Sequence, residues 1–290
     1  MNVLNALEEA VVTASETTGP AVVAVGRGAG MVVAPDRILT NAHNITGPSA
    51  TVRFADGRTE EAEVTAADLD GDLAVLTVDT DDIASVNWAD HAPGLGAAVL
   101  AFGAPRRGPA RVTVGFVSTT ERRFRGPRGR RLTGLEHTAP VGRGSSGGPV
   151  VNADGEVVGI DTHRRGDGFY LALPVSATLR QRIEVLARGE APPRRHLGVA
   201  VAPAEVAHRL RRAVGLTERD GVLVREVEED SPAARAGLRE GDLVVGAAGA
   251  PVGQPDDLLD AVDRGDGPLA LNVVRGEQEL ELTVTFVVDA

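Results

Sequence analysis

The sequence contains no cysteine and no lysine, and its aromatic residues are six phenylalanines, one tyrosine and one tryptophan. Without cysteine, a disulfide framework, a thiolate nucleophile and a cysteine-ligated metal site are excluded. A chain of 290 residues does not need disulfides, so a reducing compartment is permitted. With so few aromatics, small apolar residues must build the core, and 35 glycines and 17 prolines must interrupt the chain often. This composition favours short β-strands over long helices.

Long hydrophobic runs are also missing. No stretch approaches the roughly 20 apolar residues of a membrane-spanning helix. Residues 1–9 have neither a basic start nor an unbroken apolar stretch, so they do not resemble a signal peptide. We therefore expect a soluble, cytoplasmic protein. An envelope location would apply if the sequence is a trimmed piece of a longer chain.

The charge is negative overall but unevenly distributed. A formal net charge of −11 argues against a general nucleic-acid binder. Between Arg106 and Arg131, however, nine arginines face one acidic residue, Glu121, so this segment carries +8 and the remainder −19. Two interpretations stay open, a solvated loop or a docking surface for an acidic partner.

Residues 1–188 show many short apolar runs separated by turn residues, which is typical of β-barrels or sandwiches. A short helix is predicted over 3–17 and another from about 175 to 188. Residues 189–195, with two prolines and two arginines, are typical of an exposed linker. Residues 196–290 mix helices and strands, as expected for a small α+β domain. The expected strands are 21–25, 31–33, 38–40, 51–54, 58–65, 73–78, 97–102, 111–117, 150–151 and 157–161, then 221–227, 243–247, 269–275 and 280–287, with helices at 205–214 and 256–262.

The strongest local motif is Gly142-Arg-Gly-Ser-Ser-Gly-Gly-Pro149. A hydrolytic serine needs a sharp turn that exposes its Oγ and directs backbone N–H groups at a developing oxyanion. Glycines around Ser146 permit such a backbone. The N–H groups of Gly144 and Ser146 are the expected donors. A flexible glycine- and serine-rich loop is the alternative, and a phosphate loop is disfavoured because Gly-Lys-Ser/Thr is missing.

A serine nucleophile needs a base held by a carboxylate. His43 follows an apolar strand, where a loop can project it into a cleft. Asp68 and Asp70 occupy turn positions, where solvated carboxylates are usual. Asp72 adjoins an apolar strand and is the carboxylate expected in the interior beside an imidazole. The chain order His43, Asp72, Ser146 is that of chymotrypsin.

These motifs together resemble the HtrA (DegP/DegQ-like) family of trypsin-fold serine proteases. Residues 40–43 (Thr-Asn-Ala-His), 72–76 (Asp-Leu-Ala-Val-Leu) and 144–149 (Gly-Ser-Ser-Gly-Gly-Pro) are similar to its three catalytic motifs. The resemblance implies a mainly β fold, a trypsin-like double β-barrel over 1–188, with His43, Asp72 and Ser146 as the catalytic triad. It also implies an endopeptidase that degrades unfolded or misfolded proteins in protein quality control and stress response.

The resemblance implies two further features of the protease part. Residues 161–174 should form the primary specificity pocket, and Leu171-Ala172-Leu173 suggests apolar walls and cleavage after small aliphatic residues. Arg164, Arg165 and Asp167 could line that pocket or lie in solvent. Residues 122–131 are the candidate activation loop.

Residues 196–290 resemble the PDZ domain of the same family. The resemblance rests on residues 196–199 (His-Leu-Gly-Val), 231–238 and Gly241-Asp242. Backbone N–H groups around Leu197, Gly198 and Val199 would capture the carboxylate of a peptide C-terminus, and the peptide would add as a strand. Leu258 and Val262, four residues apart on one helix face, would wall the groove, unless they are core residues.

Three departures from the family pattern bear on these expectations. Phe54 is the first aromatic residue, so trimerisation through aromatics near the N-terminus is in doubt and the oligomeric state stays open. Asn44 follows the histidine where the family usually has an apolar residue, and Ser145 replaces the usual asparagine before the nucleophile. No cofactor, metal or nucleotide site is indicated. A dinucleotide fold is disfavoured because the glycines at 26, 28 and 30 precede a strand. The remaining alternative is a chaperone-like or adaptor protein with little proteolysis.

Overall fold

The computed structural model describes residues 2–104, 110–126, 131–190, 195–263 and 267–286. The chain divides into two compact units, Met1–Pro192 and Pro193–Ala290. This division falls within the stretch expected as a linker, residues 189–195. The domain limits of 1–188 and 196–290 remain predictions from the sequence.

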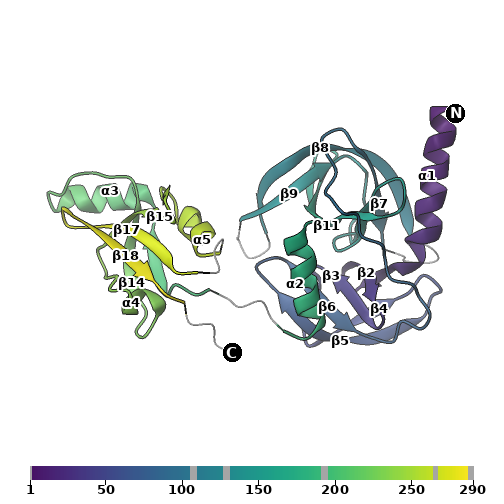
Figure 1. Cartoon of the computed structure of the whole chain (residues 1–290), viewed down its shortest axis with the longest axis horizontal. Helices are drawn as coiled ribbons and strands as arrows, with labels where there is room; N and C mark the ends of the chain where they lie inside the picture. The colour runs from purple at the N-terminus through teal and green to yellow at the C-terminus, as the bar shows by residue number, and fades with distance from the viewer. Residues whose placement is uncertain (1, 105–109, 127–130, 191–194, 264–266, 287–290) are drawn as a thin grey trace. The chain divides into compact units, whose positions relative to one another are not determined.

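Among the described residues, the first unit consists mainly of two closed antiparallel barrels (Figure 1). In the first barrel the strands neighbour each other in the order β1-β2-β3-β6-β5-β4. Its interior is filled by aliphatic side chains such as Val25, Ile38 and Leu76, all fully buried. The strands are β1 (Val22–Val25), β2 (Gly28–Ala34), β3 (Arg37–Thr40), β4 (Ser49–Arg53), β5 (Thr59–Asp68) and β6 (Leu73–Thr77).

The second barrel has the strand order β10-β11-β12-β9-β8-β7. It is likewise filled by aliphatic residues, with Leu135, Val150 and Val158 in its core. The two closed barrels confirm the predicted trypsin-like architecture. The strands are β7 (Ala98–Gly103), β8 (Arg111–Arg125), β9 (Arg131–His137), β10 (Pro149–Val151), β11 (Val157–Gly166) and β12 (Phe169–Pro174).

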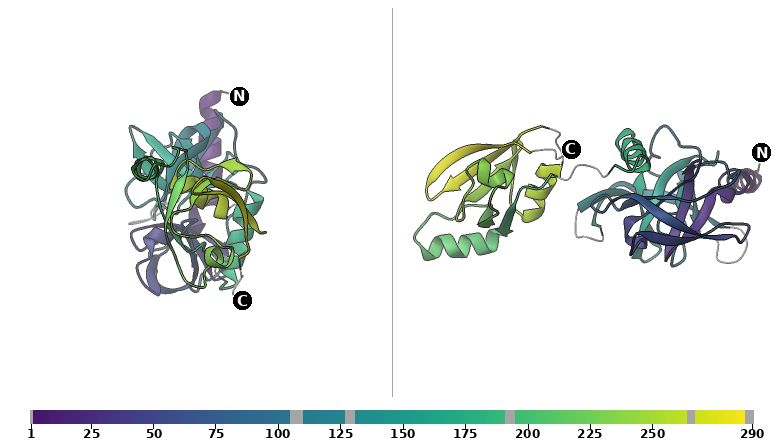
Figure 2. Two further views of the ribbon diagram at one scale, coloured as in Figure 1. Left: turned by 90° about the vertical axis from the view of Figure 1, so that its left-hand side faces the viewer. Right: turned by 90° about the horizontal axis from the view of Figure 1, so that it is seen from below.

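Two α-helices flank the barrels. Helix α1 (Val3–Thr17) begins at Asn2, whose side chain accepts from the Leu4 N–H. Its first turns project from the unit (Figure 1), whereas Ala14 near its end is buried in the core. Helix α2 (Ala177–Ala187) is capped by Ser176 and packs on β5 and β6, on the outside of the unit (Figure 2). The short 3-10 turns are η1 (Gly19–Ala21) and η2 (Ala42–Asn44).

Many strands differ from their predicted bounds by a few residues, and the differences are largest around β2, β8 and β9. Gly28 and Gly30 were expected before the strand at 31–33 but belong to β2, because Gly28 pairs with Val25 and Gly30 with Val23 of β1. Glycine is needed at position 30, since a Cβ there would lie 2.8 Å from the Leu39 carbonyl oxygen. Strand β8 runs to Arg125 instead of Val117, and β9 was not predicted. The candidate activation loop at 122–131 is therefore partly a hairpin of these strands, while residues 127–130 lie outside the described residues.

The second unit is a single antiparallel sheet with helices. Its strand order is β13-β14-β15-β17-β18, and β16 pairs with β15. The core gathers Val222, Val244, Leu271 and neighbouring aliphatics. This is the α+β domain expected from the sequence. The last strand was predicted over 280–287, and Val287 lies outside the described residues. The elements are β13 (Val199–Ala202), α3 (Ala204–Ala213), β14 (Val222–Val227), α4 (Pro232–Arg235), β15 (Leu243–Ala247), β16 (Ala250–Pro251), α5 (Pro255–Asp263), β17 (Leu269–Arg275) and β18 (Gln278–Val284).

An ion pair fixes the centre of this sheet. Asp242, directly before β15, is completely buried, and Arg275 at the end of β17 contacts both of its carboxylate oxygens at 2.8 Å. The same guanidinium donates to the Gly237 carbonyl at 2.8 Å. Hydrogen bonding to Asp242 raises the pKa of Arg275.

In neither unit do the described residues include a helix long and apolar enough to span a bilayer.

Candidate active site

His43 lies in the turn η2, directly after the buried strand β3. Its Nδ1 is 2.9 Å from both carboxylate oxygens of Asp72. A carboxylate only accepts hydrogen bonds, so Nδ1 carries the proton and Nε2 is left as the basic nitrogen. The side chain is 26% exposed, so Nε2 can be reached from solvent or substrate. This is the geometry of a general base held in one tautomer.

Asp72 stands between β5 and β6 with a φ of 58°, a left-handed conformation that is uncommon for a non-glycine residue. The residue is only 1% exposed. Besides the imidazole, its carboxylate accepts the His43 N–H at 3.1 Å and the Thr162 hydroxyl at 2.7 Å. The Asn41 amide holds its carbonyl at 2.8 Å. The charge is therefore desolvated but well satisfied, and it faces the imidazole as predicted.

Asp68 behaves differently from its prediction. It was expected to be a solvated turn carboxylate, but it is buried. Its side chain accepts the Gly71 N–H at 2.9 Å and contacts Arg182 Nη1 of helix α2 at 3.3 Å. The turn that precedes Asp72 is therefore fixed by its own carboxylate and by a neighbouring helix.

The turn around Ser146, the predicted nucleophile, is shaped by two glycines with positive φ, Gly144 at 83° and Gly147 at 92°. A Cβ on Gly147 would lie 2.2 Å from the Ala29 carbonyl oxygen, so no other residue fits there without movement. The Gly147 N–H donates to the Asp161 carbonyl at 2.6 Å, and the Gly148 N–H donates to the Ser145 carbonyl at 2.9 Å. The predicted sharp turn is present.

The Ser146 hydroxyl donates to the Thr162 carbonyl at 2.8 Å. Among the described residues it makes no hydrogen bond to the His43 ring. Thr162 thus contacts both ends of the predicted triad, because its hydroxyl donates to Asp72 and its carbonyl accepts from Ser146. No motif in the sequence singles out Thr162. A rotation about the Ser146 Cα–Cβ bond is needed to turn Oγ toward the imidazole.

The N–H groups of Gly144 and Ser146 have no protein acceptor among the described residues. Free N–H groups at this turn are what an oxyanion site requires.

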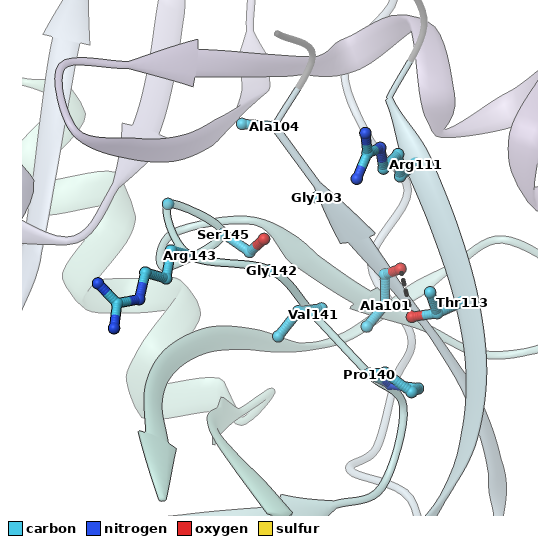
Figure 3. A pocket seen from close by; sticks show the side chains of 11 residues that line it. Ala101, Gly103, Ala104, Arg111, Thr113, Pro140, Val141, Gly142, Arg143 and Ser145 are labelled. Carbon is cyan, nitrogen blue, oxygen red and sulfur yellow. Dashed lines mark hydrogen bonds between the residues drawn. The ribbon is translucent and has the colours of Figure 1, made fainter. Parts of the chain in front are cut away.

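Residues 140–145, which lead into the turn, cover one side of a cavity of about 410 Å³ (Figure 3). Buried Ser145 stands where the family pattern has asparagine. The cavity is lined by Ala101, Gly103, Ala104, Arg111, Thr113 and residues 140–145.

The predicted specificity segment, residues 161–174, is a strand hairpin of β11 and β12. Arg164, Arg165 and Asp167 are all exposed, and Arg165 lies 3.8 Å from Glu136. His163 belongs to no sequence motif, yet its ring contacts the His43 ring edge-on with 5.9 Å between centroids. It is an aromatic neighbour of the His43 imidazole that the sequence did not predict.

A second histidine–aspartate pair lies behind the nucleophile turn. His137 Nε2 and Asp161 Oδ1 are 2.8 Å apart, and both residues are buried. Burial raises the pKa of the Asp161 carboxyl, and the neighbouring imidazole partly opposes that rise. No sequence motif joins these residues, because pairing across β9, β12 and β11 brings them together.

The predicted peptide site of the second unit begins at Leu197. The N–H groups of Leu197 and Gly198 have no protein acceptor among the described residues, whereas both carbonyls are used, by Ala233 and Glu228. Gly198 has a φ of 80°, and a Cβ there would lie 2.2 Å from Ser231 Cβ. Val199 opens β13, which pairs only with β14 among the described strands and leaves one edge of the sheet open.

Leu258 and Val262 of α5, predicted to wall the groove, are each 2% exposed. Both belong to the core cluster that also contains Leu197. In this structure they pack as core residues beside the predicted carboxylate loop. Their contact with a peptide stays a prediction.

Comparison with known proteins gives a family match for each of the two units. Residues 28–160 match the trypsin-like peptidase domain family, and residues 223–275 match the PDZ domain family. The solved structure of the HtrA-type protease AlgW with a decapeptide has a TM-score of 0.78 at 24% identity, covering 96% of this chain and 98% of that one. A serine endoprotease from Yersinia pestis reaches a TM-score of 0.73 at 26% identity, with the same coverage.

Curated relatives are similar over most of the chain. The mitochondrial serine protease HTRA2 of Bos taurus is 35% identical over 283 residues, or 91% of this chain, and the chain spans 60% of its length. HhoA of Synechocystis sp., named as a putative serine protease, is 32% identical over 277 residues, covering 89% of this chain and 70% of that protein. By sequence, by fold and by the arrangement around His43, the chain belongs to the HtrA family of trypsin-like serine proteases that carry a PDZ domain.

Proposed function

We propose that the chain is a serine endopeptidase in which Ser146 is the nucleophile, His43 the general base and Asp72 the carboxylate that orients the base. The observation that carries this proposal is the buried Asp72 carboxylate, which holds the imidazole at 2.9 Å and is linked through Thr162 to the Ser146 hydroxyl. The names of the relatives, which are serine proteases, support the same activity.

The reaction follows from these positions. Ser146 Oγ leaves the Thr162 carbonyl and gives its proton to His43 Nε2 as Oγ bonds to the substrate carbonyl carbon. The oxyanion then faces the N–H groups of Gly144 and Ser146. His43 passes the proton to the leaving amine, the C–N bond breaks, and an acyl-enzyme remains. A water molecule then gives a proton to His43 as its oxygen bonds to the acyl carbon. The bond between that carbon and Ser146 Oγ breaks, the acid is released, and His43 returns the proton to Oγ, while Asp72 stabilises the imidazolium in each step.

Unfolded polypeptides are the proposed substrates, because an extended chain can present its carbonyls to the cleft. The specificity site is proposed to favour a small aliphatic residue before the cleaved bond. Leu171, Ala172 and Leu173 are buried in β12, while Arg164 and Asp167 are exposed. A peptide library tests this preference, and cleavage only after charged residues would contradict it.

The second unit is proposed to bind peptide C-termini. Free N–H groups at Leu197 and Gly198 and the open edge of β13 would receive a terminal carboxylate and an added strand. The related protease AlgW has been solved with a decapeptide. A cytoplasmic location stays a prediction from the sequence; the names of two relatives place those proteins in mitochondria and in the periplasm.

Casein hydrolysis and labelling by a fluorophosphonate test the proposed activity. We expect casein fragments from the wild type and covalent labelling of Ser146, identified by mass spectrometry of the modified peptide. Ser146→Ala should abolish both while the protein stays folded. Ser85→Ala, at an exposed position, is the matched control and should retain both. Binding of casein by wild type and Ser146→Ala without cleavage by either would favour the chaperone-like alternative.

A further inference from the structure

Asn44, the residue after the catalytic histidine, is a buried amide with two partners. It is 6% exposed and ends the turn η2. Its Nδ2 donates to the Ser146 carbonyl at 2.8 Å and to the Thr40 hydroxyl at 3.0 Å. An amide NH₂ has two hydrogens, so both bonds can exist together. The side chain next to the base therefore holds the main chain of the nucleophile, 102 residues away in sequence.

The Ser146 carbonyl has a second donor from the same barrel. The Ala29 N–H in β2 donates to it at 2.8 Å, so both lone pairs of this oxygen are used. The Thr40 hydroxyl closes the network by donating to the Ala29 carbonyl at 2.6 Å. Every donor in this network belongs to the barrel that carries His43 and Asp72. The network therefore ties the nucleophile turn to the barrel of its base.

Gly28 makes room for the amide. A Cβ at Gly28 would lie 2.1 Å from Asn44 Nδ2 and 2.3 Å from Asn44 Cγ. Any larger residue there would displace the Asn44 side chain, because real Cβ atoms do not approach other atoms so closely. Gly28 and Asn44 thus form one arrangement, although Gly28 lies within an ordinary strand.

We propose that Asn44 is a positioning residue that fixes Ser146 relative to His43, with Gly28 supplying the space it needs. This inference rests on the proposed peptidase function. An apolar side chain at position 44 would leave the Ser146 carbonyl with the Ala29 N–H as its one donor, so that one of the two hydrogen bonds holding the turn to the first barrel is lost. Because attack requires the hydroxyl within about 3–3.5 Å of its target, a looser turn lowers the rate more than it lowers substrate binding.

Steady-state kinetics on the full chain provides the test. Asn44→Leu removes the donor at similar volume, and Asn44→Asp replaces it with an oxygen that repels the Ser146 carbonyl. We expect both to lower kcat by about tenfold or more while KM changes less than about threefold. Gly28→Ala should lower kcat in the same way. Gly47→Ala, where a Cβ meets nothing within 4 Å, and exposed Asn5→Leu are the matched controls and should match the wild type.

A second readout is independent of turnover. In a Ser146→Ala background, Asn44→Leu and Gly28→Ala should speed amide hydrogen exchange in residues 144–148, and Gly47→Ala should not. A kcat within twofold of wild type for Asn44→Leu and Gly28→Ala, or unchanged exchange in both, would overturn the positioning role. If the wild type cleaves no substrate, the proposed function fails, and the exchange measurement alone decides the role of Asn44.

Discussion

Thr162 links two members of the proposed triad, Asp72 and Ser146. Its hydroxyl donates to Asp72 and its carbonyl accepts from Ser146, while the neighbouring His163 contacts the His43 ring. Motif reasoning selects the residues proposed to react, because their chemistry is distinctive. It does not select a threonine whose importance lies in two hydrogen bonds across the barrels.

Thr162→Val tests the hydroxyl of this residue at constant shape. Loss of the bond leaves Asp72 Oδ2 with one donor fewer in a buried site, so we expect a loss of about 1–2 kcal/mol in the free energy of unfolding. We also expect kcat/KM to fall severalfold, because Asp72 is then held less firmly against His43. Urea unfolding and casein kinetics check both. The exposed Thr133→Val should behave like wild type, and an equal effect in both variants would contradict the assignment.

Asp161 predicts a pH dependence of stability. Its pKa in the folded protein is raised by burial, so the folded state holds this proton more tightly than the unfolded chain. The stabilisation is complete below the ordinary carboxyl pKa and is lost as the pH rises through the raised value. Asp161→Asn cannot ionise. The stability of the wild type relative to this variant should therefore fall with rising pH across that window, as measured by thermal unfolding at several pH values. A difference independent of pH would contradict the raised pKa.

At the scale of strands and helices, the sequence predicts the limits of a strand well where its apolar run coincides with the stretch that pairs with neighbouring strands. Strands β15 and β17 have the expected limits, Leu243–Ala247 and Leu269–Arg275, because their apolar runs are both buried and bounded by turns. Strand β8 continues past its predicted end at Val117, because β9 pairs with Arg122, Arg123 and Arg125 even though these residues have no apolar pattern. Long-range pairing of this kind leaves no local trace.

The same distinction between local and long-range signals separates the parts of the site that could be predicted from those that could not. His43, Asp72 and Ser146 each lie at a turn beside a strand, in motifs that together carry the family resemblance from which the triad was predicted. Asn44 stands out in the sequence only as a departure from the family pattern, since its partner Ser146 lies 102 residues away. The His137–Asp161 pair depends on the register of three strands and could not be inferred from spacing alone.

The sheet of the second unit depends on Arg275, which neutralises buried Asp242. Arg275→Leu leaves that carboxylate without its cation, although the Arg239 N–H still donates to it at 2.8 Å. We expect the second unit to lose about 2–4 kcal/mol of unfolding free energy, because removing one partner of a buried ion pair leaves the other charge buried without compensation. Urea unfolding resolves this as an earlier transition of one unit. Arg225→Leu, an exposed arginine in β14, should cause little change, and comparable losses in both would contradict this account.

At the scale of the whole molecule, two units share one chain but have separate cores. A peptide bound at Leu197 and Gly198 can therefore affect proteolysis only by coupling the units or by recruiting substrate. The hairpin of β8 and β9, which contains part of the candidate activation loop, belongs to the barrel of Ser146.

We predict that peptides with a free C-terminal carboxylate raise casein turnover by the full chain severalfold. The same peptides with an amidated C-terminus should not, because the N–H groups of Leu197 and Gly198 would lack their anionic acceptor. A version ending near Arg188 should not respond to either peptide. Equal turnover by the full chain and the shorter version, with and without peptide, would exclude coupling.

The resting contact between Ser146 and the Thr162 carbonyl sets a limit on how latent this protein can be. A side-chain rotation takes place within picoseconds to nanoseconds, whereas turnover in typical enzymes takes about a millisecond to a second. Breaking one hydrogen bond of about 1 kcal/mol reduces the competent population only about fivefold. A lag of seconds before product forms would therefore report a slower rearrangement of the backbone, and rapid-mixing experiments would find its origin outside the serine side chain.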